Sequence, residues 1–293
     1  MAKAPRQGGG PRSIGGYYAS GDWSDYWRTA ISRAGDGTII VHGYPIDEII
    51  EHLSFIEMAY LMLRGELPTA QQAAGLDLAL RASVDQQFIS AAVPPARYVA
   101  SAAPEAPVAA IASGVLAFGS VTGSPQECAE MVLDALATMR DGSLSREATA
   151  AKVVDAHEGE GKRIPGLGHP MHKTEEPRVT ALRKAADKLG LWGDAAAMLE
   201  AVQSEFAARR RHVPINLAGA MACLLVELGF RPLEMSGLAV MGYLPSLIAH
   251  TVEEITDGVP LRIIPDALGA EYVGPELRHL PEAYVGRSDD SAD

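Results

Sequence analysis

The spacing of apolar residues predicts a chain that is built almost entirely from helices. Between residues 46 and 63 the apolar positions recur at the 3.6-residue period of one helical face, and Gly65 ends this stretch. We predict one helix there and further helices at about 69–84, 106–119, 124–140, 145–158, 177–190, 194–212, 215–229 and 232–256. A different pattern, GDGTIIVHGYPI, precedes the first of these helices and predicts a short β-ribbon.

Two of the predicted helices begin with a capping signal. Thr69 and Gln72 have the spacing of a capping box, in which each side chain accepts a hydrogen bond from the backbone N–H of the other residue. Ser124 and Glu127 have the same spacing, and Pro125 suits the first helical position. Several predicted helices end at a glycine, namely Gly190, Gly229 and Gly258. We see no internal repeat and no run of strands alternating with helices, so the predicted fold class is all-α.

Three of the predicted helices are apolar on nearly every side. They cover residues 106–119, 215–229 and 235–250, and such helices are usually buried on both sides. Burial between two subunits would satisfy this requirement, so we expect a homodimer. The longest apolar stretch, SGLAVMGYLPSLIAH, is interrupted by Pro245 and is too short to cross a bilayer, so we expect no membrane association.

Composition narrows the class of protein. The 293 residues are 47% hydrophobic and 21% charged, which is ordinary for a soluble globular protein of one or two domains. The net charge of −12 argues against nucleic-acid binding, and an anionic substrate would have to be held by a few local cations. Cys128 and Cys223 lie in apolar stretches and are expected to be reduced core thiols. The first residues are basic and rich in Gly and Pro but lack the apolar core of a signal peptide, so we expect a cytoplasmic protein.

The stretch IPGLGHPMHKTEEPR, residues 164–178, combines a rigid turn with a histidine and two cations. Pro165 and Pro170 restrict the backbone around His169, which suits a group that must donate a hydrogen bond to a reacting carbonyl. Arg178 falls in the first turn of the next predicted helix, where its guanidinium can fork onto a carboxylate. A histidine after such a turn is, by itself, more often a hydrogen-bonded structural residue than a catalyst.

The same stretch resembles the PGFGHPVYK…DPR signature of the citrate synthase family, including its short citryl-CoA lyase branch. IIVHGYPIDEII followed by ELPT resembles the N-terminal ribbon and first helices of that family, and AAIASGVLAFGSVTGSPQE resembles its buried helix and glycine loop. VPINLAGAMACLLVELGF resembles the helix that carries the catalytic aspartate. PLRIIPDALGAEYVGPELRHLPE resembles the C-terminal segment of the lyase branch. Together these motifs cover nearly the whole chain after about residue 35.

The resemblance implies an all-α, citrate synthase-like dimer with its active site between a large and a small helical domain. We place the large domain at 36–165 and 213–293 and the small domain at 166–212, after a loose N-terminal tail at 1–35. Members of the family join or split a carbon–carbon bond between an acyl-CoA and a 2-oxo acid. The expected ligands are therefore a coenzyme A thioester and a carboxylic acid, with no metal.

Four cationic positions of the family are matched in this chain. His169 matches the histidine that polarises the carbonyl of the oxo acid, and Arg178 matches an arginine that binds a carboxylate. Lys173 matches a cation that reaches a CoA phosphate, and we assign the turn glycines Gly166 and Gly168 to the CoA site with it. Arg262 lies within one position of a carboxylate-binding arginine that the family supplies across the dimer.

Other family positions carry different residues. Thr122 replaces the histidine of the glycine loop, a second family histidine falls at Gln87, and a family arginine falls at Tyr243. The helix that should open with NVD reads NLA, so Ala218 stands where the family has its proton-abstracting aspartate. We expect Thr122 and Tyr243 to act in catalysis with His169. We expect Gln87 and the Asn216 of NLA to bind substrate with Arg178 and Arg262.

Four functions remain open at this stage. In the first, the chain is a citryl-CoA lyase- or citrate synthase-like enzyme with a changed substrate, in which Glu127, His172, His212 or Tyr243 serves as the base. In the second, it catalyses a different reaction in the same pocket, such as hydrolysis, decarboxylation or dehydration. In the third, it is an inactive member that binds CoA or carboxylates, and in the fourth, it is a structural partner of an active paralogue. Because the His169 turn is intact, the first of these is favoured.

Other kinds of site have no sequence signal. No Walker-type glycine loop precedes a lysine, and no GxGxxG motif follows a predicted strand. His169 and His172 are three positions apart, but a proline lies between them and no HExxH motif is present, so a zinc site is not expected.

Overall fold

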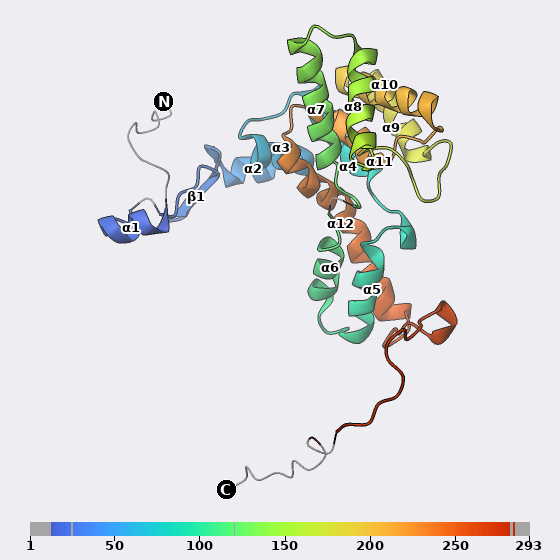
Figure 1. The fold of residues 1–293 in the computed structure, drawn as a ribbon. Coiled ribbons are helices and arrows are strands. Elements are labelled where there is room, and N and C mark those ends of the chain that lie inside the picture. The colour runs from blue at the N-terminus through green and yellow to red at the C-terminus, as the bar shows by residue number, and fades with distance from the viewer. Residues whose placement is uncertain (1–12, 25, 120, 282–283, 285–293) are drawn as a thin grey trace.

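The structure is a computed structural model that describes residues 13–24, 26–119, 121–281 and 284 (Figure 1). Twelve α-helices carry the fold in this part of the chain, which confirms the predicted all-α class, although helices α1 and α5 were not predicted. The helices before the His169 turn are α1 (Ile14–Ser20), α2 (Ile46–His52), α3 (Phe55–Arg64), α4 (Ala70–Ala82), α5 (Val93–Ala102), α6 (Pro107–Val115), α7 (Gln126–Asp141) and α8 (Arg146–Gly159). Those after it are α9 (Pro177–Lys188), α10 (Asp194–Arg209), α11 (Leu217–Glu227) and α12 (Pro232–Asp257). Two short 3₁₀ helices are η1 (Gln87–Ile89) and η2 (Asp266–Leu268).

The predicted β-ribbon is present near the N-terminus. Strands β1 (Ser32–Gly35), β2 (Thr38–Val41) and β3 (Tyr44–Pro45) form one antiparallel sheet in that order. With α1 it extends away from the main body of helices, to the left in Figure 1. Residues 13–35 of the predicted loose tail therefore include a helix and a strand, and residues 1–12 lie outside the described residues.

The single helix predicted from residue 46 to 63 is wrong, because the structure has two helices there. The Ser54 hydroxyl accepts a hydrogen bond from the backbone N–H of Glu57 at 3.3 Å, and the Glu57 carboxylate accepts one from the backbone N–H of Ser54 at 2.8 Å. This capping box starts α3, and Leu53 has extended backbone angles that end α2. The apolar period continues across the break, which is why it does not reveal the break.

The other capping signals had mixed outcomes. The capping box of Thr69 and Gln72 is confirmed at the start of α4. The one predicted for Ser124 and Glu127 is wrong, because α7 begins at Gln126 with Pro125 as its N-cap. The Ser124 hydroxyl instead accepts from the Gln126 N–H at 3.2 Å and exchanges a hydrogen bond with the Ser236 hydroxyl at 2.7 Å.

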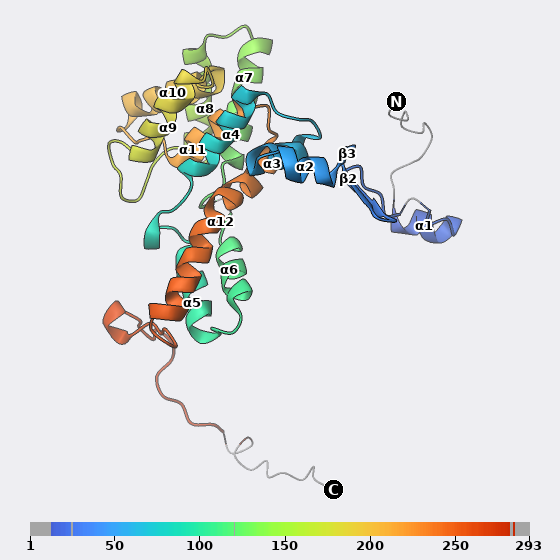
Figure 2. The same ribbon diagram turned by 180° about the vertical axis from the view of Figure 1, so that it is seen from behind.

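The core lies around α11, which is buried along most of its length. Helices α4, α7, α9, α10 and α12 pack against it, and their buried side chains form the largest apolar cluster. A second, smaller cluster lies where α5 and α6 pack on the later part of α12, and it includes Tyr243 and Leu247. Figure 2 shows α12 running from the first group of helices to the second. The division into a large and a small domain stays a prediction.

Helix α12 is the one described helix whose length and composition would allow it to cross a membrane. It contains Pro245, and 44% of its most apolar window is buried inside the protein. Core helices of globular proteins meet the same criterion, and the packing of α12 against α4, α5, α6 and α7 is of that kind.

Candidate active site

The Gly/Pro turn that presents His169 is fixed to the start of α11. The Gly168 N–H donates to the carbonyl of Pro214 at 2.7 Å, and the Asn216 N–H donates to the carbonyl of Gly166 at 2.9 Å. The Asn216 side chain donates to the carbonyl of Gly168 at 3.0 Å and accepts from the Gly219 N–H at 3.0 Å, so it also caps α11. The nitrogen and the oxygen of the Asn216 amide are therefore both hydrogen-bonded to backbone groups. Its substrate-binding role stays a prediction, and in this structure Asn216 positions the turn.

Gly166 shows how closely the turn approaches α11. Its φ of +83° lies in the left-handed region, and a Cβ on it would lie 2.5 Å from Cys128 Sγ and 3.0 Å from Gly219 Cα. Gly168 has a similar φ of +87°, but a Cβ there would meet no atom within 4 Å. The sequence therefore needs glycine at 166 for close packing and at 168 only for its backbone angle.

We predict that Gly166→Ala destabilises the protein more than Gly168→Ala. The second change adds only left-handed strain of about 1–2 kcal/mol, whereas the first adds an overpacking cost of about 1–3 kcal/mol as well. Urea unfolding of both variants measures this difference. Equal losses would mean that the contact with Cys128 and Gly219 relaxes at no cost.

The contacts of His169 define which ring nitrogen carries its proton. Nδ1 lies 3.1 Å from the backbone nitrogens of Met171 and His172, and both N–H groups donate to it. A nitrogen that accepts hydrogen bonds carries no proton, so the proton of the neutral ring is on Nε2. The structure places the amide nitrogen of Gln86 2.5 Å from Nε2, where two N–H donors would face each other. Only the amide oxygen can accept from Nε2–H, so we assign the oxygen to this position.

The surroundings of His169 also favour the neutral ring. Partial burial lowers the pKa of His169, and the nearby His172, Arg178 and Lys173 lower it further, while Glu176 opposes them. The ring of His172 lies beside that of His169, with centroids 4.5 Å apart. At neutral pH His169 is therefore an uncharged donor whose Nε2–H points out of the turn.

The two cations after the turn already have partners within the chain. Arg178 forks onto Glu176, with Nε 3.0 Å from Oε1 and Nη2 2.7 Å from Oε2. Glu176 is only 1% exposed, and although burial raises its pKa, the hydrogen bonds and charge of Arg178 outweigh this and keep the pKa low. Lys173 donates to the carbonyl of Pro170 at 2.5 Å and to that of His169 at 3.3 Å. The third guanidinium nitrogen of Arg178 has no hydrogen bond among the described residues and could receive a carboxylate.

Among the described contacts, Tyr243 and Thr122 reach the His169 turn only through other residues. The Tyr243 hydroxyl is 3.4 Å from Asp85 Oδ1, and Asp85 directly precedes Gln86. Burial raises the pKa of Tyr243, so its phenol stays protonated and acts as a donor. The ring of Phe118 packs edge-on against Tyr243 at 5.5 Å and leads into the glycine loop, where Thr122 pairs with Gly119 through two backbone hydrogen bonds.

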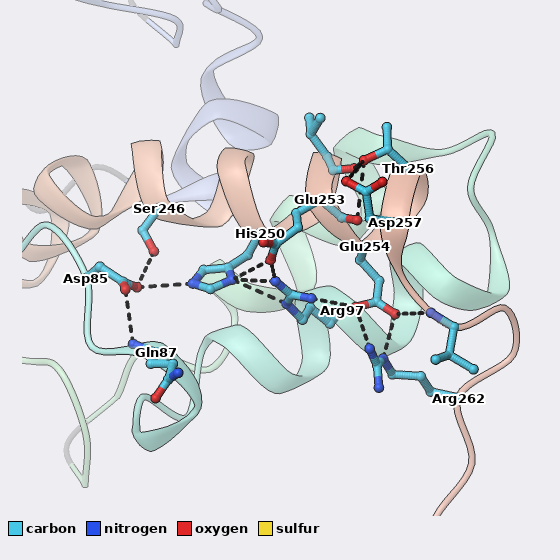
Figure 3. Close-up of polar contacts among 12 residues, drawn as sticks. Asp85, Gln87, Arg97, Ser246, His250, Glu253, Glu254, Thr256, Asp257 and Arg262 are labelled. Atoms are coloured by element: carbon cyan, nitrogen blue, oxygen red, sulfur yellow. Dashed lines mark hydrogen bonds and ion pairs between the residues drawn. The ribbon is translucent and has the colours of Figure 1, made fainter.

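Arg262 and Gln87 are not brought together with His169 by any described contact. Both line a cavity of about 530 Å³ near the end of α12, together with Arg97 and His250. Arg262 forks onto the buried Glu254 at 2.5 and 2.9 Å (Figure 3). Gln86, and not Gln87, touches His169. The match of Gln87 to a family histidine stays a prediction. Two adjacent glutamines offer no local signal to choose between them.

Position 218 itself carries no base. Ala218 lies in the first turn of α11 and offers only a methyl group. Among the proposed substitute bases, His212 Nε2 lies 2.9 Å from the carbonyl of Thr174, and the raised pKa of Tyr243 disfavours a phenolate. Asp85 was not predicted, yet it is the carboxylate next in sequence to the residue that binds His169.

A family model described as citrate synthase, C-terminal domain, matches residues 25–120 and 73–264, which together span most of the chain. The chain belongs to the citrate synthase family. The solved structure of citryl-CoA lyase from Hydrogenobacter thermophilus is similar over 88% of this chain and 99% of that one, with 28% identity and a TM-score of 0.78. The structural match therefore extends over almost the entire lyase and supports the citryl-CoA lyase branch.

Two further matches are to longer proteins. A curated protein of Mycobacterium tuberculosis with the name "Putative citrate synthase 2" is 31% identical over 147 residues, which is 49% of this chain and 38% of that protein. The chain thus matches well under half the length of its curated relatives. ATP citrate lyase from Methanothrix soehngenii, solved with citrate and coenzyme A, matches 94% of this chain and 46% of its own, with 18% identity and a TM-score of 0.73. At that identity the match concerns the fold.

Proposed function

We propose that the protein binds a coenzyme A thioester of a hydroxy acid, as citryl-CoA lyases do, and cleaves or forms the carbon–carbon bond that joins the acyl group to a 2-oxo acid. Membership of the citrate synthase family supports chemistry on CoA thioesters of this general kind. The exact substrate and the direction of the reaction belong to the proposal. Coenzyme A would enter as part of the substrate, near Lys173 and the glycine turn.

The observation that carries this proposal is that His169 Nδ1 accepts two backbone hydrogen bonds, from which we infer that the ring proton is on Nε2. In the cleavage direction, the substrate hydroxyl gives its proton to a base, its oxygen becomes the carbonyl of the oxo acid, and the electrons of the broken bond pass to the thioester enolate. The enolate then takes up a proton to give the acyl-CoA. A neutral N–H donor aimed at that oxygen stabilises the charge that develops on it. The substrate oxygen would take the place of the Gln86 amide, which now accepts this hydrogen bond at 2.5 Å.

A homodimer is part of the proposal. Apolar side chains remain exposed on α6 and α12 and in the segment after α12, which extends past the end of that helix (Figure 2). They include Val108, Leu116, Ile248, Val252, Ile263 and Leu268. A second copy would cover this surface and would bring Arg262 toward the site of its partner. We also propose that the protein acts in the cytoplasm.

Two incubations test the reaction directly. Purified protein is mixed with citryl-CoA, and separately with acetyl-CoA plus oxaloacetate, while oxaloacetate and free thiol are followed over time. Turnover in either mixture supports the proposed function. No turnover with any CoA thioester, at protein concentrations that would reveal slow reaction, contradicts it.

A second candidate function is favoured by Ala218. A member of the family that lacks the proton-abstracting group loses about 10²–10⁴ in rate, and its remaining role would be to bind CoA or carboxylates. Thermal stabilisation by coenzyme A without turnover supports this function. If coenzyme A, citrate and their thioesters give neither turnover nor thermal stabilisation, the remaining function is that of a structural partner for an active paralogue.

Arg178 offers a further test of the carboxylate site. Arg178→Ala is expected to raise the KM for the carboxylate substrate about 10–100-fold, the equivalent of one charge-assisted hydrogen bond of about 1.5–3 kcal/mol. The change also strands the buried Glu176 carboxylate, so the double variant with Glu176→Gln serves as the control for stability. If the double variant restores the KM, Arg178 supports the fold and does not bind substrate.

A further inference from the structure

A chain of charged and polar side chains runs along the outer half of α12 and ends at Asp85 (Figure 3). Asp85 Oδ1 accepts hydrogen bonds from the Ser246 hydroxyl at 2.6 Å and from His250 Nε2 at 3.2 Å. His250 Nδ1 in turn accepts from Arg97, whose Nε and Nη2 lie 3.2 and 3.0 Å away. Arg97 is 7% exposed and pairs with the buried Glu254, which also holds Arg262. We call Asp85, Ser246, His250 and Arg97 the Asp85 network.

The donors and acceptors in this network determine the state of His250. A guanidinium group can only donate, so Nδ1 of His250 is an acceptor and carries no proton. The proton of the neutral ring is therefore on Nε2, where it is donated to Asp85. Burial raises the pKa of Asp85, but the hydrogen bonds from Ser246, the Gln87 N–H and His250 outweigh this and lower it, so Asp85 stays ionised.

The loop that carries Asp85 and Gln86 contacts two imidazole rings, one through each of these residues. His250 on α12 donates to Asp85, and His169 on the glycine turn donates to the next residue, Gln86. Asp85 also accepts from the Gln87 N–H at 3.2 Å, which supports the left-handed φ of +53° that Gln87 adopts. The backbone on both sides of Gln86 is thus held by one carboxylate.

We propose that Asp85 is a positioning residue for His169, because its bonds to α12 hold Gln86 against Nε2 of that ring. Asp85 does not contact His169 itself and acts only through the loop. Every polar group of the network already has a partner in the chain, so the network is a scaffold and not an empty ligand site. The proposal goes beyond the proposed function, because the state of the His169 ring exists whether or not the protein turns over a substrate.

The test follows the His169 ring by NMR in protein labelled with ¹⁵N-histidine, with no ligand present. In the parent protein His169 is expected to show the Nε2–H tautomer and a pKa below the ordinary value. In Asp85→Asn the loop is held less firmly and water reaches the ring, so the pKa of His169 is expected to rise and the Nε2 chemical shift to change. The Nε2–H tautomer should persist, because the Met171 and His172 N–H groups still donate to Nδ1. If the protein has turnover, kcat is expected to fall about 10²-fold while KM changes little, as for a misplaced catalytic group.

Matched variants separate positioning from general loss of stability. Asp77→Asn on α4 removes a carboxylate of similar exposure that pairs only with Arg81, and it should leave the His169 signals unchanged. His250→Gln keeps a donor near the Nε2 position and should preserve the His169 ring state, whereas His250→Ala should shift it as Asp85→Asn does. Should Asp85→Asn fail to fold, the His250 pair and Ser246→Ala decide the question with the same signals. A folded Asp85→Asn or His250→Ala protein with the parental His169 pKa and Nε2 chemical shift overturns the proposal.

Discussion

Replacing His169 by alanine is expected to abolish turnover of any CoA thioester substrate. The side chain supplies a neutral Nε2–H whose direction is fixed by two backbone N–H donors on Nδ1. Loss of one preorganised donor to a developing oxyanion lowers kcat by about 10²–10³-fold. No other neutral N–H donor contacts Gln86 in the described part of the chain, so no neighbouring group replaces it. Steady-state kinetics on citryl-CoA, with oxaloacetate as the measured product, show the loss.

Two substitutions at the same position separate the donor from the shape of the turn. An asparagine oxygen lies near the position of Nδ1, so His169→Asn can still accept from the Met171 and His172 N–H groups but has no donor at the position of Nε2. His169→Gln places a donor near Nε2 and loses the acceptor at Nδ1. We expect His169→Asn to keep the parent melting temperature and lose activity. We expect His169→Gln to retain part of the activity. Full activity in His169→Asn would show that the site has been assigned to the wrong group.

The helices of this protein could be predicted because, within each local stretch of sequence, the residues that become buried recur at the helical period. Helix α11 is apolar nearly all round and lies at the centre of the core, as its sequence requires. The break between α2 and α3 was missed although S-F-I-E carries a capping signal, because the apolar period alone does not mark where a helix is interrupted. Local polar bonds, and not hydrophobic pattern, decide such boundaries.

The site was predictable only where it is contiguous in sequence. His169, Lys173 and Arg178 lie in one stretch, and the structure places Lys173 and Arg178 close enough to affect the pKa of His169. Gln86 lies 83 positions from His169, and Asp85 lies 165 positions from His250, so their contacts depend on how α12 crosses the loop after α4. No local sequence pattern predicts that crossing. The carboxylates Glu176 and Glu254, which pair with the two predicted carboxylate-binding arginines, lie only two and eight positions from them, but the local sequence does not show that either carboxylate is buried.

Introducing a carboxylate at Ala218 is expected to raise the rate of proton removal from the carbon next to a thioester. Ala218 is the second residue of α11, where the helix N-terminus stabilises an anion by about 0.3–1 kcal/mol. An Ala218→Asp side chain would therefore be ionised at neutral pH, and a positioned base contributes about 10²–10⁴-fold in rate. Exchange of the acetyl protons of acetyl-CoA with D₂O, followed by NMR, measures this step without requiring the complete reaction.

The isosteric Ala218→Asn variant is the control, because it fills the same space and cannot accept a proton. We expect exchange to increase in Ala218→Asp and to stay at the parent rate in Ala218→Asn. Thr122→His combined with Ala218→Asp should increase exchange further, since groups that act on one transition state depend on each other. If the parent already exchanges these protons rapidly, another group acts as base, and Asp85 is then the first carboxylate to substitute. If Ala218→Asp binds coenzyme A yet exchanges no faster than the parent, position 218 does not face the thioester and its match to the catalytic aspartate is wrong.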